Sequence, residues 1–117
     1  MLLFSMLLIG CSTHTKNKYH EKHYQALLCN KLHGKMEYVL ADRTRVDCLT
    51  LEYAIEVDFA KKWAESVGQS LYYAQMTDKK PAVGFIMNSE KDGRYFKRLD
   101  ALAKQYGIKI FIIEKEK

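Results

Sequence analysis

Residues 45–73 constrain the fold of this chain more than any other stretch. Two short runs rich in β-forming residues come first, separated by almost nothing, and a segment with helical spacing follows at once. Within the runs the polar residues recur with a period of two, which puts Asp47, Glu56 and Asp58 on one face. We therefore expect two paired strands that lead into a helix, with three carboxylates converging on one edge of a small sheet.

The rest of the chain alternates between helical and strand-like patterns. Apolar residues three and four apart indicate helices, whereas alternating or continuous apolar runs indicate strands. The later β-α-β-α-β order implies parallel strands, and the earlier strands form an antiparallel meander. The predicted class is α/β, with a mixed sheet flanked by helices. In chain order we expect a helix at 20–32, strands at 34–40, 45–51 and 53–59, a helix at 60–76, a strand at 82–87, a helix at 92–106 and a strand at 108–113.

The three carboxylates restrict what this edge of the sheet can be. Buried, unpaired carboxylates are costly, so the cluster must be exposed, paired with cations or holding a metal ion. Hard divalent cations take oxygen ligands, usually one or two carboxylates together with water and phosphate. Asp47 and Glu56 meet that demand, and we expect them to hold Mg²⁺ or Mn²⁺.

The spacing of these residues resembles the PD-(D/E)xK nuclease superfamily, which has a restriction-endonuclease-like domain. Asp47 is followed by Glu56 after roughly ten residues, as in the family's metal-binding motif. The next helix carries Gln69 and Tyr73 four residues apart, similar to the family's Gln-x-x-x-Tyr element. The expected order αβββαβαβ is also that of the family's core, and the resemblance covers about residues 27–113.

One position departs from the family's pattern. Two residues after the metal-binding Glu the family usually has Lys, and this chain has Asp58. Some members carry the Lys on the following helix, which favours Lys62, because Lys62 shares a helical face with Gln69. We expect Lys61 to pair with Glu65 instead, as a solvated ion pair of little energetic weight.

The resemblance implies a metal-dependent nuclease, either an endonuclease or an exonuclease, that hydrolyses phosphodiester bonds. The expected partner is nucleic acid, DNA before RNA. The implied roles are metal binding for Asp47 and Glu56, catalysis for these two with Asp58, Lys62 and Gln69, support of the site for Glu37 and Tyr73, and phosphate binding for Arg45.

Two alternatives to an active nuclease remain open at this point. The first is a catalytically inactive relative that keeps the fold as a binding or structural module, which the carboxylate of Asp58 favours. The second is an envelope lipoprotein unrelated to nucleases, in which the acidic residues form a solvated edge.

The first residues resemble a bacterial lipoprotein signal. Residues 1–10 are apolar but too few to span a bilayer, and they predict a signal peptide. Residues 8–11 resemble a lipobox, which implies a lipid on Cys11 that anchors the protein to a membrane. We expect a flexible tether at 11–22, a single domain at 23–117, and a location in the cell envelope, on the outer membrane or the periplasmic side. The alternative is a cytoplasmic protein with a misassigned start, because no Lys or Arg precedes the apolar run.

Charge and cysteines add weaker constraints. The net charge of +5 permits a phosphate-rich partner without requiring one. Cys29 and Cys48 either pair in an oxidising envelope or remain as two buried thiols. The histidines fit no metal-site spacing, and we assign them no catalytic role. Besides Arg45, the candidate phosphate contacts are Arg43, Lys79, Lys80, Lys91 and Arg94.

Overall fold

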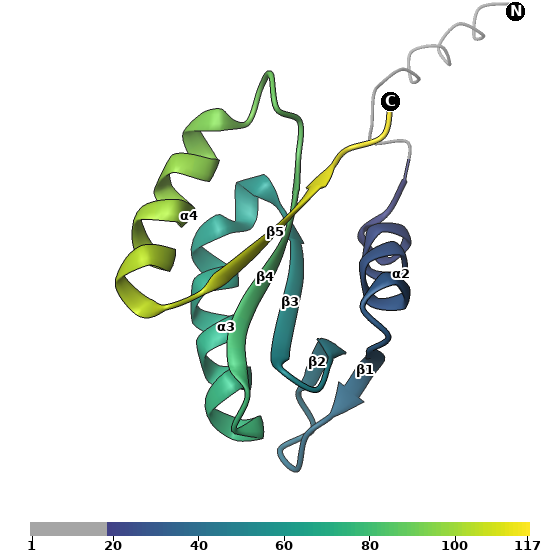
Figure 1. Ribbon diagram of the computed structural model, residues 1–117. Coiled ribbons are helices and arrows are strands. Elements are labelled where there is room, and N and C mark those ends of the chain that lie inside the picture. The colour runs from purple at the N-terminus through teal and green to yellow at the C-terminus, as the bar shows by residue number, and fades with distance from the viewer. Residues whose placement is uncertain (1–18) are drawn as a thin grey trace, which may run out of the picture.

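The structure, a computed structural model, describes residues 19–117. Its elements follow the order expected from the sequence (Figure 1). They are α2 (Glu21–Lys31), β1 (Lys35–Val39), β2 (Arg45–Leu49), β3 (Tyr53–Phe59), the short 3-10 helix η2 (Ala60–Lys62), α3 (Trp63–Thr77), β4 (Lys80–Met87), α4 (Gly93–Tyr106) and β5 (Lys109–Glu114).

The five strands form one mixed sheet in the order β1-β2-β3-β4-β5. β1, β2 and β3 are antiparallel neighbours, whereas β3, β4 and β5 run parallel. Parallel neighbours need a crossover connection, and α3 and α4 provide it. The expected α/β class, with an antiparallel meander followed by parallel strands, is therefore confirmed.

Helices cover both faces of the sheet (Figure 1). On one face, Tyr24 and Leu28 of α2 belong to a buried cluster with Ile86 of β4. On the other face, Leu99 of α4 packs in a second cluster with Phe85 of β4, and α3 adds partly buried side chains. β4 is covered on both faces, which explains its continuous apolar sequence.

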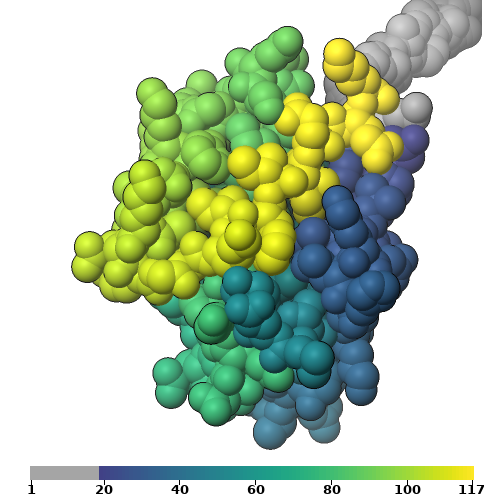
Figure 2. All heavy atoms as spheres, in the orientation of Figure 1, coloured from purple at the N-terminus to yellow at the C-terminus, as the bar shows by residue number. Residues whose placement is uncertain are grey.

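The edge strands are more exposed than the centre. Val39 in β1 is 59% exposed and Ile112 in β5 is 55% exposed. Figure 2 shows β5, in yellow, crossing the surface between α4 and α2. The buried part of the sheet is therefore β3 and β4, and the carboxylates of β3 lie within it.

Several boundaries differ slightly from the expected ones. β4 begins at Lys80, two residues early, because Pro81 still pairs with Ala54 in the parallel ladder. The predicted helix 60–76 begins as a 3-10 turn and ends at Thr77, and the next residue, Asp78, has a left-handed φ of 58°. α2 begins at Glu21, one residue after the expected start of the helix, so it includes the last two residues of the range expected for the tether; an acidic residue in its first turn is favourable.

A disulfide joins Cys29 of α2 to Cys48 of β2, with the Cα atoms 5.7 Å apart. Of the two alternatives for these cysteines, the structure has the pair. The predicted signal peptide, the lipobox, Cys11 and the first part of the tether lie outside the described residues. Within residues 19–117, no helix has both the length and the apolar character needed to cross a membrane.

Candidate functional site

The site lies where strands β2 and β3 separate. The ladder between them reaches Cys48 and Ile55 and does not continue to Asp47. Instead, Oδ2 of Asp47 accepts a hydrogen bond from the backbone N–H of Val57 at 2.8 Å. The carboxylate of Asp47 therefore takes the place of a strand-to-strand hydrogen bond, which fixes its orientation beside β3.

Glu56 lies next to Asp47 and is buried, with 6% of its surface exposed. Burial, and then the charge of Asp47, raise the pKa of Glu56 to about 10. Burial also raises the pKa of Asp47 to about 6, and the two side chains are hydrogen-bonded to each other. Near pH 7 Glu56 is therefore the neutral donor and Asp47 the acceptor, because two carboxylates this close cannot both be charged without a cation.

Asp58 forms the second part of the cluster and is also buried, with 4% exposure. Burial first, and then the charge of Glu21 and a hydrogen bond to that residue, raise its pKa to about 7. The ammonium of Lys62 acts in the opposite direction, with Nζ 4.0 Å from Oδ1 of Asp58. Lys62 follows Asp58 by four residues and places a positive charge beside it.

Glu37 from β1 is held beside the site by Gln25 of α2. Gln25 is 2% exposed, and its Nε2 donates to Oε2 of Glu37 at 2.7 Å and to the carbonyl of Asp47 at 2.9 Å. The guanidinium of Arg45 lies 3.7 Å from the other carboxylate oxygen of Glu37. Glu37 has a φ of 56°, a strained value for a residue other than glycine, so its neighbours must hold it there.

Tyr73 of α3 closes the site from the helical side. Its side chain is buried, and burial followed by the charges of Glu56 and Asp47 raises its pKa to about 12. The hydroxyl therefore stays protonated near the carboxylate pair and can act as a hydrogen-bond donor.

Gln69 was expected in the cluster, but it lies outside it. It is exposed and lines a shallow surface pocket of about 420 Å³ together with Tyr72 and Tyr73. The buried stripe of α3 contains Ser66, Ser70 and Tyr73. Because each helical residue turns by about 100°, Gln69 is rotated away from Ser70 toward solvent.

The expected ion pair between Lys61 and Glu65 is also absent from the described part of the chain. The charge of Lys61 acts on Tyr95 of α4 instead. Lys61 belongs to η2, the 3-10 turn before α3, so helical spacing within α3 does not give its neighbours.

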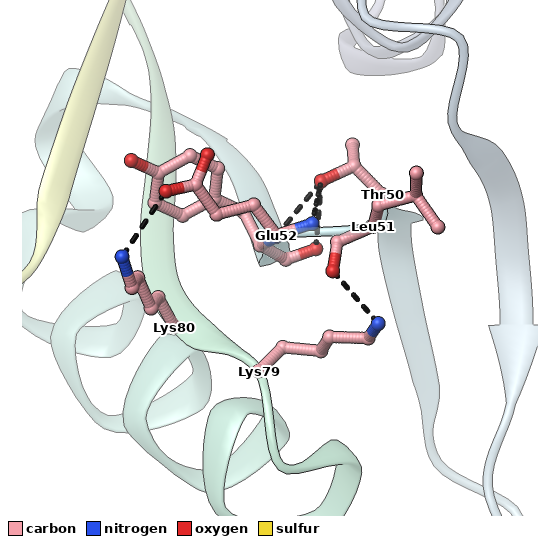
Figure 3. A network of polar contacts seen from close by, with 6 residues as sticks. Thr50, Leu51, Glu52, Lys79 and Lys80 are labelled. Carbon is pink, nitrogen blue, oxygen red and sulfur yellow. Dashed lines mark hydrogen bonds and ion pairs between the residues drawn. The ribbon is translucent and has the colours of Figure 1, made fainter.

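Two of the candidate phosphate contacts, Lys79 and Lys80, bind the turn between β2 and β3 (Figure 3). Nζ of Lys79 donates to the carbonyl of Leu51 at 2.8 Å, and Nζ of Lys80 lies 3.1 Å from Glu52. Lys80 begins β4, whereas Asp58 is near the end of the parallel strand β3, about five residues or about 16 Å further along. These lysines tie the β2–β3 turn to β4, and their placement argues against a role at the carboxylates.

The oxygen donors of the cluster fit a hard divalent cation. Asp47 and Glu56 offer two carboxyl groups that lie within hydrogen-bonding distance of each other. A cation between the carboxylates would remove the repulsion that raises their pKa values. Within residues 19–117, no three His, Cys, Asp or Glu side chains are arranged to hold a metal ion. A site built on Asp47 and Glu56 would supply two carboxylates and leave the other positions to water and phosphate, as Mg²⁺ sites commonly do.

Two residues of the cluster, Glu21 and Gln25, were not predicted from the sequence. They are four residues apart on α2, and they contact Glu37 and Asp58 of the site. The sequence contains one indication for Gln25, which is a polar residue of the predicted helix next to Tyr24 and four residues before Cys29. The structure buries all three side chains. Glu21 had no such indication, since it lies in a polar stretch that is typical of a tether.

No family model, curated protein or solved structure matches this chain. Its class is therefore the one that its own fold and site define. It is a mixed α/β protein with a buried carboxylate cluster at the point where two central strands part.

Proposed function

We propose that this protein is a metal-dependent nuclease of the PD-(D/E)xK type that hydrolyses phosphodiester bonds, with DNA as the favoured substrate. The observation that carries the proposal is the carboxyl pair of Asp47 and Glu56 where β2 and β3 separate. Lys62, 4.0 Å from Asp58, adds a positive group to the same edge. Two carboxylates and a nearby ammonium are the parts that metal-assisted phosphodiester hydrolysis needs.

Each side chain of the site has a separate role in the proposed reaction. A bound Mg²⁺ or Mn²⁺ would lower the pKa of a coordinated water and stabilise negative charge on the scissile phosphate. Asp47 and Glu56 would hold the ion, and the N–H of Val57 keeps Asp47 in position. Asp58 orients Lys62, whose ammonium positions the attacking water.

The restriction-endonuclease-like fold is part of this proposal. The order αβββαβαβ supports it, as does the five-stranded mixed sheet with helices on both faces. The Asp of β2, the Glu of β3 and the Lys that follows β3 come from consecutive elements, as in the motif that the chain resembles.

We also propose a location in the cell envelope, with a lipid on Cys11 as the membrane anchor. The disulfide between Cys29 and Cys48 supports this location, because disulfides persist in oxidising compartments and are rare in the cytoplasm.

A second candidate is an inactive relative that serves as a binding module. One observation favours it, namely that the neutral Glu56 and the charged Asp47 satisfy each other by a hydrogen bond. A pair of this kind is stable without a metal ion. The presence of Asp58 at the family's Lys position also fits an inactive site.

Cleavage assays on the full chain separate the two candidates. Labelled single- and double-stranded DNA and RNA are incubated with Mg²⁺, Mn²⁺ or EDTA. We expect metal-dependent cleavage that falls by at least about 100-fold in Glu56→Gln. Glu65→Gln, which changes an exposed glutamate on α3, is the matched control and should cleave normally. If the folded wild-type protein cleaves none of the substrates, the nuclease proposal is wrong and the binding module is favoured.

A further inference from the structure

A surface of cations and aromatic rings lies on the starts of η2, α3 and α4. Arg94 donates from Nη2 to the hydroxyl of Tyr95 at 2.9 Å, and its guanidinium lies 4.7 Å from the ring centroid. The guanidinium of Arg98 lies 5.8 Å from the ring of Trp63 and 5.9 Å from that of Tyr95. We call these four residues together with Lys61 the Arg94–Arg98 surface. Its arginines are exposed but held in place by the rings.

Among the described residues, Asp92 acts on Arg94 through its charge but forms no ion pair with it. Neither arginine forms an ion pair with a carboxylate of residues 19–117, and neither does Lys61. The hydrogen bond from Arg94, and then the charges of Arg94, Lys61 and Arg98, lower the pKa of Tyr95, so all three cations act on one ring. Five of the chain's 14 acidic residues gather at the carboxylate cluster together with Lys62 and Arg45, which leaves nine acidic residues to balance the other 17 lysines and arginines.

Local folding does not account for these charges. The first turn of α4 contains no acidic residue, although Arg94 lies in it. Cations near a helix N-terminus oppose the helix dipole, so Arg94 weakens the helix that carries it. The nearby carboxylate of Asp92 accepts a hydrogen bond from the backbone of Asn88. An anion from outside the chain would give the arginines the partner that the fold does not.

The surface is continuous with the carboxylate cluster through η2. Lys62 lies 4.0 Å from Asp58, whereas its neighbour Lys61 acts on Tyr95. η2 follows β3 and α4 follows β4, and these strands are parallel. The starts of α3 and α4 therefore lie at the same end of the sheet as Asp58 (Figure 1).

We propose that the Arg94–Arg98 surface binds the phosphate backbone of the nucleic-acid strand that enters the carboxylate cluster. This inference rests on the proposed nuclease function and deepens it. Guanidinium groups bind phosphate oxygens in a bidentate manner, and Tyr95 already orients both arginines. The rings of Trp63 and Tyr95 pack against a buried cluster and lie under the guanidinium groups, so the arginines are the groups that this surface offers to a strand.

Binding measured without cleavage tests the surface separately from the catalysis. The full chain is titrated in EDTA into a fluorescein-labelled single-stranded DNA, and anisotropy is followed at several salt concentrations. We expect Arg94→Gln/Arg98→Gln to weaken binding at least about tenfold and to reduce the slope of log K against log salt by about 1.4, which corresponds to two phosphate contacts. Lys31→Gln/Lys35→Gln removes the same charge from exposed positions on α2 and β1 and should bind like wild type.

Each outcome decides one of the two proposals. Equal binding by the arginine variant and wild type, or equal weakening in the lysine control, overturns the surface. If the arginine variant binds DNA like wild type but no longer binds anionic phospholipid vesicles that wild type binds, the proposal is also overturned and the surface is a membrane contact instead. If the arginines are needed for binding but wild type cleaves nothing with metal present, the surface stands and the nuclease proposal fails.

Discussion

Glu56→Gln should stabilise the metal-free protein near neutral pH. The pKa of Glu56 is raised to about 10 in the folded state from an ordinary value of 4.5. A carboxyl with a raised folded-state pKa contributes stability that is complete below its unfolded pKa and is lost as the pH rises. Keeping it protonated near pH 7 costs about 1.4 kcal/mol per pH unit above 4.5, or up to about 3 kcal/mol. Gln carries no such cost and can still donate a hydrogen bond to Asp47.

Urea unfolding followed by the fluorescence of Trp63, the single tryptophan, measures this difference. In EDTA we expect the variant to exceed wild type by up to about 3 kcal/mol near pH 7 and by almost nothing near pH 4.5. Saturating Mg²⁺ should stabilise wild type more than the variant, because the ion replaces the proton. A variant that is less stable than wild type near pH 7, or a difference that does not change with pH, would refute the reasoning.

Three further predictions concern residues around the pair. Gln25→Met should lower the free energy of unfolding by about 2 kcal/mol, because it removes two hydrogen bonds of a buried side chain, one of them to a carboxylate; an unchanged urea midpoint would contradict this. Reduction of the disulfide, which joins residues 19 apart in sequence, should cost about 3 kcal/mol, measured by unfolding with and without reductant and compared with Cys29→Ala/Cys48→Ala. Lys62→Met should lower kcat for cleavage by about 100-fold with little change in KM, whereas Lys31→Met should alter neither; an equal rise in KM would show that Lys62 only binds substrate.

Much of the fold could be predicted because its patterns are strong. β3 matches the predicted strand 53–59, and the other ends are within about two residues. The alternation in β3 separates Ile55 and Val57, which pack under α2, from Glu56 and Asp58. Period-two patterns of this kind are local, so they can be recognised without knowledge of the tertiary structure.

The contacts that the sequence did not reveal depend on tertiary structure. Small polar residues form the buried stripe of α3, so hydrophobic spacing could not show that Ser70 faces inward and Gln69 outward. The residue on which the charge of Lys61 acts, Tyr95, is on α4, more than 30 residues further along the chain. Glu21 reaches Asp58 only because α2 packs across the sheet. Periodicity within one element cannot report contacts between elements.

Direct binding of Mn²⁺ to the full chain is the measurement that tests the central claim, a divalent cation site at Asp47 and Glu56. It does not depend on which nucleic acid is the substrate. Titration followed by electron paramagnetic resonance should show one bound ion per chain in wild type and in Glu65→Gln. Binding should be at least about tenfold weaker in both Asp47→Asn and Glu56→Gln. Equal binding by all four proteins, or no binding by wild type, would contradict the account.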